Sequence, residues 1–173
     1  MKYIDEIQKG MDLLASKDAI FVGQAVAFKG TALTHQVKDY PKHQKLELPV
    51  AEEFQMGACI GLAIAGHFPV SVYPRANFAI LACNQIVNHL DKWEKMGGKP
   101  LNVIIKIAVG SQYPLWPGYQ HCSNYAQAFR DMCTSIEVHD LLYPNQIFKA
   151  YQRASEGGSH ILIEHADLYK LDV

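Results

Sequence analysis

The sequence has little charge imbalance, no long apolar run and few cysteines, and each of these shortages excludes a class of protein. Sixteen basic and seventeen acidic side chains leave a formal net charge of −1. The chain is therefore not expected to attract nucleic acid or an anionic membrane through an overall positive charge. The longest apolar stretch, residues 56–66, is too short to span a bilayer. The amino-terminal MKYIDEIQKG lacks the apolar centre of a signal peptide.

The four cysteines form neither a C-x-x-C pair nor a metal-site spacing, so reduced thiols in a cytoplasmic protein are expected, with no metal ligand in this chain. No G-x-x-x-x-G-K-[ST] phosphate loop occurs. With 173 residues, of which 49% are apolar and 19% charged, the chain can bury a sizeable core. We expect one domain over residues 1–173.

Apolar residues switch repeatedly between helical and extended periods along the chain. The pattern predicts helices over residues 4–14, 52–65, 80–95, 123–132 and 144–155, and strands over residues 19–22, 46–50, 69–73, 103–109, 135–138 and 160–164. Residues 23–45 and 110–120 are expected to be long loops. Alternating strands and helices predict an α/β fold, in which three α/β/α layers surround a mainly parallel sheet.

The most informative stretch begins with two adjacent carboxylates, Glu52 and Glu53. In the apolar run that follows, Gly57, Gly61 and Ala65 recur every four positions and share one helical face. Another backbone can approach so small a face closely. A carboxylate here is ordinarily a favourable charge at a helix N-terminus, but burying it in an apolar segment would require a partner.

Several residues of this stretch, and a second motif, keep the spacing of a known family: Pro49, Glu52, Gly57, Gly61, Gly66, Pro69, Asn77, Phe78, Gln85 and Asn88, and then Gln120-His121-Cys122 in place of Gln-His-Ser. The pattern resembles the pyrimidine-binding domain of thiamin-diphosphate enzymes. The beta subunits of pyruvate and branched-chain 2-oxoacid dehydrogenases are most similar, and transketolase is more distant. The likeness weakens before residue 46 and after residue 142. It implies the thiamin-diphosphate-binding fold of the pyrimidine-domain type.

The resemblance implies roles for five side chains. Glu52 matches the glutamate that bonds the cofactor's pyrimidine and activates it, and Phe78 matches the aromatic that stacks on that ring, with Tyr73 as a wall of the pocket. His121 matches the histidine that orients substrate or relays protons. Arg75 replaces a small polar residue of the dehydrogenases and would bind a substrate carboxylate or phosphate. The alternatives are a core aromatic for Phe78, a structural histidine for His121, and a solvated charge or subunit contact for Arg75.

Glu53 and Cys122 are the competing candidates. On a helix Glu53 points about a quarter turn away from Glu52, so both cannot reach one atom, and the spacing to the glycines favours Glu52. A Cys122–His121 nucleophile pair is disfavoured, because adjacent side chains rarely face each other productively and no third orienting group is evident.

The Gly-Asp-Gly segment that binds magnesium and diphosphate in this family does not occur in the sequence. The resemblance therefore implies half a site, without a diphosphate-binding domain or a carboxy-terminal transketolase-type domain. A separate alpha-like, diphosphate-binding subunit would be the main holder of the magnesium ion. The assembly would be a homodimer or a heterotetramer. The expected enzyme is a thiamin-diphosphate-dependent 2-oxoacid dehydrogenase or decarboxylase, or a transketolase-like enzyme. It would act on a small 2-oxoacid or ketose-type molecule only with that partner.

Two other functions remain open from the sequence. One is a non-catalytic interaction protein that keeps the fold, although joint retention of Glu52, Phe78 and His121 argues against it. The other is an unrelated small-ligand-binding α/β domain, which a pocket far from Glu52 would favour.

Overall fold

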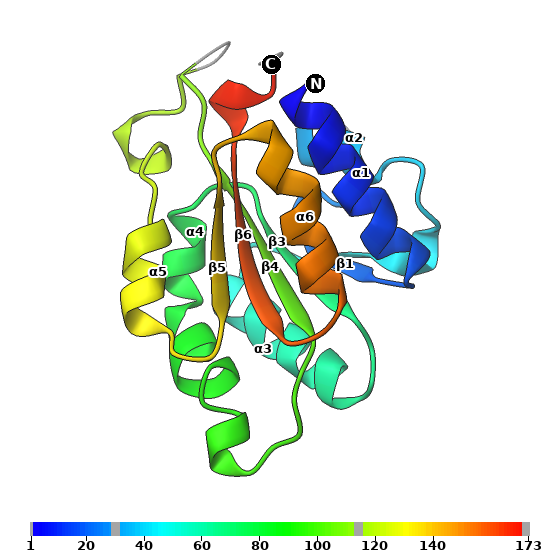
Figure 1. Ribbon diagram of the computed structural model, residues 1–173, viewed down its shortest axis with the longest axis vertical. Helices are drawn as coiled ribbons and strands as arrows, with labels where there is room; N and C mark the ends of the chain where they lie inside the picture. Colours follow the sequence, from blue (N-terminus) through cyan, green and yellow to red (C-terminus); the bar gives the residue numbers. More distant parts are fainter. Residues whose placement is uncertain (1, 29–31, 113–115, 171–173) are drawn as a thin grey trace.

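A parallel sheet forms the centre of the protein, whose computed structural model describes residues 2–28, 32–112 and 116–170 (Figure 1). The sheet has six strands in the order β2-β1-β3-β4-β6-β5, and every neighbouring pair is parallel. The strands are β1 (Ile20–Gly23), β2 (Lys45–Glu47), β3 (Pro69–Tyr73), β4 (Val103–Val109), β5 (Glu137–Leu141) and β6 (Ser159–His165). The predicted α/β class is confirmed.

Helices cover both faces of the sheet (Figure 1). One face packs against α1 (Tyr3–Ser16), α2 (Ala32–Val37) and α6 (Pro144–Ser155). The other packs against α3 (Glu52–Ile64), α4 (Phe78–Leu81), the π-helix η2 (Asn84–Leu90) and α5 (Ala126–Met132). Short 3-10 turns are η1 (Lys42–Gln44), η3 (Glu94–Met96), η4 (Tyr119–His121) and η5 (Ala166–Leu168). No helix among the described residues is both long and apolar enough to cross a membrane.

The neighbouring strands β4 and β6 carry an ion pair inside the core. Lys106 on β4 and Glu164 on β6 are each only 1% exposed in their side chains, and their Nζ and Oε1 atoms are 2.5 Å apart. The Tyr169 hydroxyl donates a second hydrogen bond to the same oxygen at 2.6 Å. The core of a sheet covered on both faces therefore contains a charged contact in the described part of the chain.

The first and last helices pack against each other, which brings the two ends of the chain together. The Tyr3 hydroxyl donates to the Leu141 carbonyl at 2.6 Å and accepts from the His165 N–H at 3.0 Å. Gly10 permits the close approach of α1 to α6, because a Cβ at this position would overlap the ring of Tyr151.

Residues 23–45 are not the irregular loop that the sequence predicted. They contain α2 and η1, and Leu33 and Val37 are buried one helical turn apart against the sheet. Two apolar residues are too short a pattern to mark a helix in advance. Strand β2 is also shorter than predicted, ending at Glu47 instead of residue 50.

The helix predicted over residues 80–95 is broken into α4, η2 and η3. The Asp91 N–H donates to the Ile86 carbonyl at 2.9 Å, a wide turn of the π type. The Asp91 carboxylate accepts from the N–H groups of Thr134 and Ser135 at 2.8 and 2.6 Å, and so anchors the helix end to the segment before β5. These tertiary contacts outweigh the regular helical period.

Two predicted element starts were also wrong. Helix α5 begins at Ala126, whose N–H donates to the Asn124 side-chain oxygen at 2.9 Å, so Ser123 does not cap it. Strand β5 spans Glu137–Leu141 and not residues 135–138, because Asp91 holds the N–H groups that would begin the ladder. Helix α3 ends at Ile64, one residue before the predicted end, and Gly66 at φ +89° terminates it.

Candidate active site

The order of the strands reverses beside β1, and this reversal locates the candidate site. The chain passes from β1 to β2 on one side of the sheet and then to β3 on the other. In open parallel sheets, ligands bind outside the carboxyl ends of the strands at such a reversal. Gln24 directly follows β1, and Tyr73 ends β3. Both side chains contact Glu52, the first residue of α3.

Glu52 is a buried carboxylate, 5% exposed. Its Oε1 atom accepts a hydrogen bond of 3.3 Å from the Gln24 amide, and its main-chain carbonyl accepts one of 3.4 Å from the Tyr73 hydroxyl. Burial raises the pKa of Tyr73 far above its ordinary value, so this hydroxyl stays protonated and donates. The positive end of α3 favours a negative charge at this position. One long side-chain hydrogen bond leaves the carboxylate able to bind a further donor.

Glu53 points away from this site. It is exposed, and its Oε1 atom accepts from the amides of Asn84 and Gln85 on η2 at 3.3 and 3.5 Å. Asn88 in turn donates to Asn84 at 3.1 Å. The prediction that Glu52 and Glu53 point in different directions is therefore confirmed. The amides of η2 donate hydrogen bonds to the exposed Glu53 carboxylate.

His121 and Phe78 lie side by side although they are far apart in sequence. Their ring centroids are 5.5 Å apart, with the planes at 62°. His121 Nδ1 is 2.9 Å from the Asn77 side-chain oxygen. Because an amide oxygen can only accept, Nδ1 carries the proton in this contact. Nε2 is then the nitrogen available to a ligand.

Gly110 brings the loop of His121 back onto the end of β4. Its N–H donates to the His121 carbonyl at 3.0 Å. A Cβ at Gly110 would overlap that carbonyl and would lie 3.2 Å from the Arg75 guanidinium. Arg75, which is half-buried, therefore lies beside the backbone that carries His121.

The five predicted site residues thus gather at the carboxyl edge of the sheet. Tyr73, Arg75 and Phe78 lie at or directly after the end of β3, and Gly110 ties His121 to the end of β4. The described hydrogen bonds join Glu52 to Gln24 after β1 and to Tyr73 at the end of β3, and do not join it to His121. The edge carries two groups of side chains, and a ligand long enough to touch both would connect them.

Two residues that support this edge were not predicted to belong to it. Gln24 holds Glu52, and its position immediately after a strand was the available signal. Asn77 orients His121, although its sequence match had suggested no role. The Cys122 thiol donates to the Gly118 carbonyl at 3.5 Å, which accounts for the thiol without a nucleophile pair.

Exposed apolar side chains flank the edge. Trp116 and Tyr119, 47% and 86% exposed, contact each other with ring centroids 5.2 Å apart. Residues 113–115 of this predicted loop lie outside the described residues. On the outer face of α3, a Cβ at Gly61 would meet no atom within 4 Å, and Phe54 and Ile64 are 62% and 53% exposed. The small-residue face predicted for close packing is therefore open at Gly61, whereas a Cβ at Gly57 would contact Gln85 of η2.

Comparisons with known proteins agree with this arrangement. The chain is 27% identical over 141 residues to the acetoin:2,6-dichlorophenolindophenol oxidoreductase subunit beta of Cupriavidus necator, covering 77% of this chain and 40% of that protein. It is 31% identical over 102 residues to the mitochondrial 2-oxoisovalerate dehydrogenase subunit beta of Dictyostelium discoideum, covering 57% and 28%. The resemblance to dehydrogenase beta subunits is confirmed.

The fold of this beta-like chain is transketolase-like. A solved split-gene transketolase, an inactive beta4 tetramer, matches 98% of the chain with a TM-score of 0.69 and 19% sequence identity, over 52% of its own length. No family model matches the chain. The beta-like chain spans less than half the length of the two curated relatives described above.

Proposed function

We propose that residues 1–173 form the pyrimidine-binding half of a thiamin-diphosphate-dependent enzyme, sharing the cofactor with a separate diphosphate-binding, alpha-like subunit. The observation that carries this proposal is the buried Glu52 at the strand reversal, whose carboxylate accepts from Gln24 after β1 and whose main-chain carbonyl accepts from Tyr73 at the end of β3. Phe78 and His121, at the same edge, support it. The named relatives support it too, because both are beta subunits.

The side chains at this edge suit the pyrimidine part of the cofactor. Phe78 is half-buried and presents a ring on which a flat heterocycle can stack. Glu52 would share a proton between its carboxyl oxygen and a ring nitrogen, in a position that is shielded from solvent. When bound, thiamin diphosphate supplies carbanion chemistry at its thiazolium ring.

His121 and Arg75 would handle the substrate, a small 2-oxoacid or ketose-type molecule. With Nδ1 fixed by Asn77, His121 would offer Nε2 to orient a substrate oxygen or relay a proton. The Arg75 guanidinium beside the same loop would bind a carboxylate or phosphate. These roles of His121 and Arg75 are compatible with either a dehydrogenase or a transferase.

The partner subunit would cover the exposed apolar surface next to the site. Exposed apolar side chains are found at Trp116, at Tyr119 and on the outer face of α3. Contiguous apolar surface of this kind often marks a protein–protein interface. A second copy of this chain would use the small-residue face, and the alpha-like subunit would use the aromatic pair. The resulting assembly would be a homodimer or a heterotetramer.

The proposal is tested by isolating the untagged protein from its source cells and identifying what co-purifies. Calorimetry with thiamin diphosphate and magnesium then compares the complex with this chain alone. We expect binding to the complex and only weak binding to the isolated chain, because the sequence offers no diphosphate cradle. Micromolar binding by the chain alone contradicts the shared site, and a stable complex that binds no cofactor favours a non-catalytic interaction protein.

A further inference from the structure

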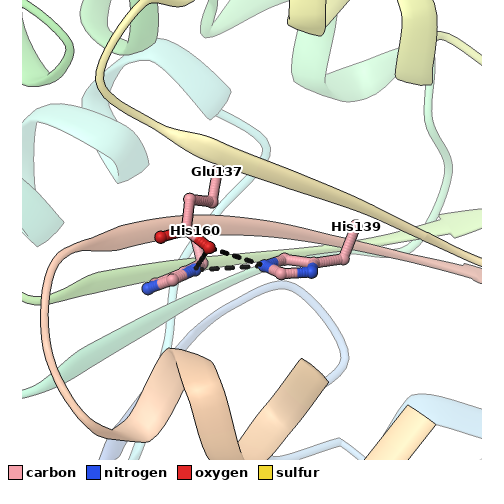
Figure 2. A group of neighbouring side chains, drawn as sticks. All are labelled: Glu137, His139 and His160. Atoms are coloured by element: carbon pink, nitrogen blue, oxygen red, sulfur yellow. Dashed lines mark hydrogen bonds and ion pairs between the residues drawn. The ribbon is translucent and has the colours of Figure 1, made fainter. Parts of the chain in front are cut away.

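Three potential metal ligands meet at the opposite end of the sheet from Glu52. Glu137 and His139 are two residues apart on β5, so they share one face of the strand. The register pairs Glu137 with His160 of β6, which places the His160 side chain on the same face. Figure 2 shows the three side chains directed toward one another between the two strands.

The spacing of the ligand atoms suits a small cation. His139 Nε2 and His160 Nδ1 are 3.1 Å apart, and each is 3.8 Å from Glu137 Oε2. A point equidistant from these three atoms would be about 2.1 Å from each, within the range of Zn–N and Zn–O bonds. The three side chains therefore need little movement to bind one ion.

Hydrogen bonds outside the triad already orient two of the ligands. His160 Nε2 is 3.0 Å from the Gly157 carbonyl, which can only accept, so Nε2 carries the proton and Nδ1 presents its lone pair to the cluster. Arg153 donates to Glu137 Oε1 at 2.5 Å, which leaves Oε2 toward the imidazoles. In the metal-free protein the His139 Nε2–H donates to His160, so binding requires the His139 proton to move to Nδ1.

The cluster is open to solvent on the side of His139. This side chain lines a hollow of ≈ 340 Å³ with six other residues: Asp140, Leu141, Gln146, Lys149, Ala150 and Arg153. His160 is 1% exposed in its side chain, His139 22% and Glu137 44%. An ion can therefore enter from the hollow, and water can complete a tetrahedral set of ligands.

The surrounding charges decide which ions fit. Arg153 and Lys149 are cationic neighbours that oppose a hard divalent ion held mainly by charge. Two imidazole nitrogens and one carboxylate instead favour borderline transition ions such as Zn²⁺ or Co²⁺ over Mg²⁺ or Ca²⁺. We propose that Glu137, His139 and His160 bind one divalent transition-metal ion that clamps the edge strand β5 to β6.

Titration of the purified, untagged chain with Co²⁺, followed by displacement with Zn²⁺, tests this proposal through the visible absorption of the bound cobalt. We expect one equivalent to bind and to be displaced, and Zn²⁺ to raise the melting temperature. His139→Ala should weaken binding at least about a hundredfold, because loss of even a supporting hydrogen bond typically costs about ten- to a hundredfold. His139→Gln provides a second variant of similar size, and Glu137→Gln should weaken binding as well.

His67→Ala is the matched control, since this histidine is exposed and lies outside the triad. It should bind cobalt like the parent chain. Equal affinity in the parent and in folded His139→Ala or His139→Gln overturns the proposal, as does a parent chain that binds no cobalt. Circular dichroism of each variant confirms that the chain has folded before the titrations are compared.

Discussion

Glu52 and Glu53 are neighbours in sequence, yet their carboxylates point in different directions from α3 and have different partners. Glu52 is buried and bonded to Gln24, whereas Glu53 is exposed and bonded to the amides of η2. The pair therefore provides a built-in comparison between two carboxylates of the same type and nearly the same position. Only one of them lies where the strand order reverses.

Glu52→Gln should slow cofactor activation in the complex by about a hundred- to ten-thousandfold, the typical cost of removing a positioned acid–base group. The amide keeps the size of the side chain but cannot exchange a proton. Hydrogen–deuterium exchange at the thiazolium carbon measures the effect without a known substrate. Glu53→Gln is the control and should exchange at the parent rate; the reverse order would show that Glu53 is the activating group.

His121→Ala should leave thiazolium exchange largely unchanged and slow a step that involves substrate. The reason is that His121 is held by Asn77 and Gly110, while Glu52 is held by Gln24 and Tyr73. Pre-steady-state kinetics of the complex separates the two steps. Loss of exchange in His121→Ala would mean that the histidine also activates the cofactor.

Gly61→Leu should weaken assembly while leaving the fold of a single chain intact. A Cβ at Gly61 would meet no atom of the described chain within 4 Å, so this exposed position has room for the added side chain and a loss of assembly would indicate a clash with another chain. Light scattering over a range of concentrations measures the assembly. Lys42→Leu adds the same side chain at an exposed site away from α3 and should assemble normally; equal behaviour of the two variants would place the interface elsewhere.

Asp91→Asn should destabilise the fold by about 1–3 kcal/mol near neutral pH, because several donors lose a charged acceptor. Burial alone would raise the pKa of Asp91, but hydrogen bonds from Lys92, Ser135 and Thr134 outweigh it and hold the pKa well below its ordinary value. A depressed folded pKa stabilises the protein above the unfolded pKa of about 4, and this stability is lost as the pH falls toward the folded value.

The free energy of unfolding in urea, measured for the parent and for Asp91→Asn at pH 6 and pH 3, should therefore show a smaller difference at pH 3. Asp18→Asn is the control, because this exposed residue has φ +57°, a conformation that asparagine also adopts. It should change stability by less than about 0.5 kcal/mol at either pH. A difference for Asp91→Asn that does not shrink with acid would exclude the charge as its cause.

Lys106→Met and Glu164→Leu should each cost about 3–5 kcal/mol of stability, since each leaves one uncompensated charge in the core. The double variant should recover much of that loss. The free energies of unfolding in urea of the parent, both single variants and the double variant form a double-mutant cycle. Strictly additive losses would show that the ion pair contributes no coupling energy.

The architecture was predictable because its apolar patterns are long. β3, β4 and α6 have the bounds that the sequence predicted, and each is a nearly continuous apolar or amphipathic run. The breaks in the helix predicted over residues 80–95 were not predictable, because they depend on contacts between residues that are far apart in sequence. The π-turn of η2 depends on Asp91 contacts with Thr134 and Ser135, which lie more than forty positions along the chain.

The candidate active site was predictable only through resemblance. Composition and periodicity marked Glu52 as a helix-terminal charge, and the family spacing gave it a chemical role. The metal ligands bear no family pattern, and the expectation of no metal ligand rested on cysteine spacing. Glu137 and His139, two apart on one strand, were the only local sign, because His160 joins them through the register of β5 and β6.

The contact of α1 with α6 constrains the order in which the chain can fold. During synthesis the apolar side of α1 emerges before α6 and before Leu141 and His165, the hydrogen-bond partners of Tyr3, which lie more than 130 positions further along the chain. An all-parallel sheet adds to this delay, since every strand pair must wait for a crossover connection. The nascent chain therefore carries an apolar helix without its α6 contact until α6 and β6 are made, which is the interval in which chaperone binding or early pairing with another subunit protects it best.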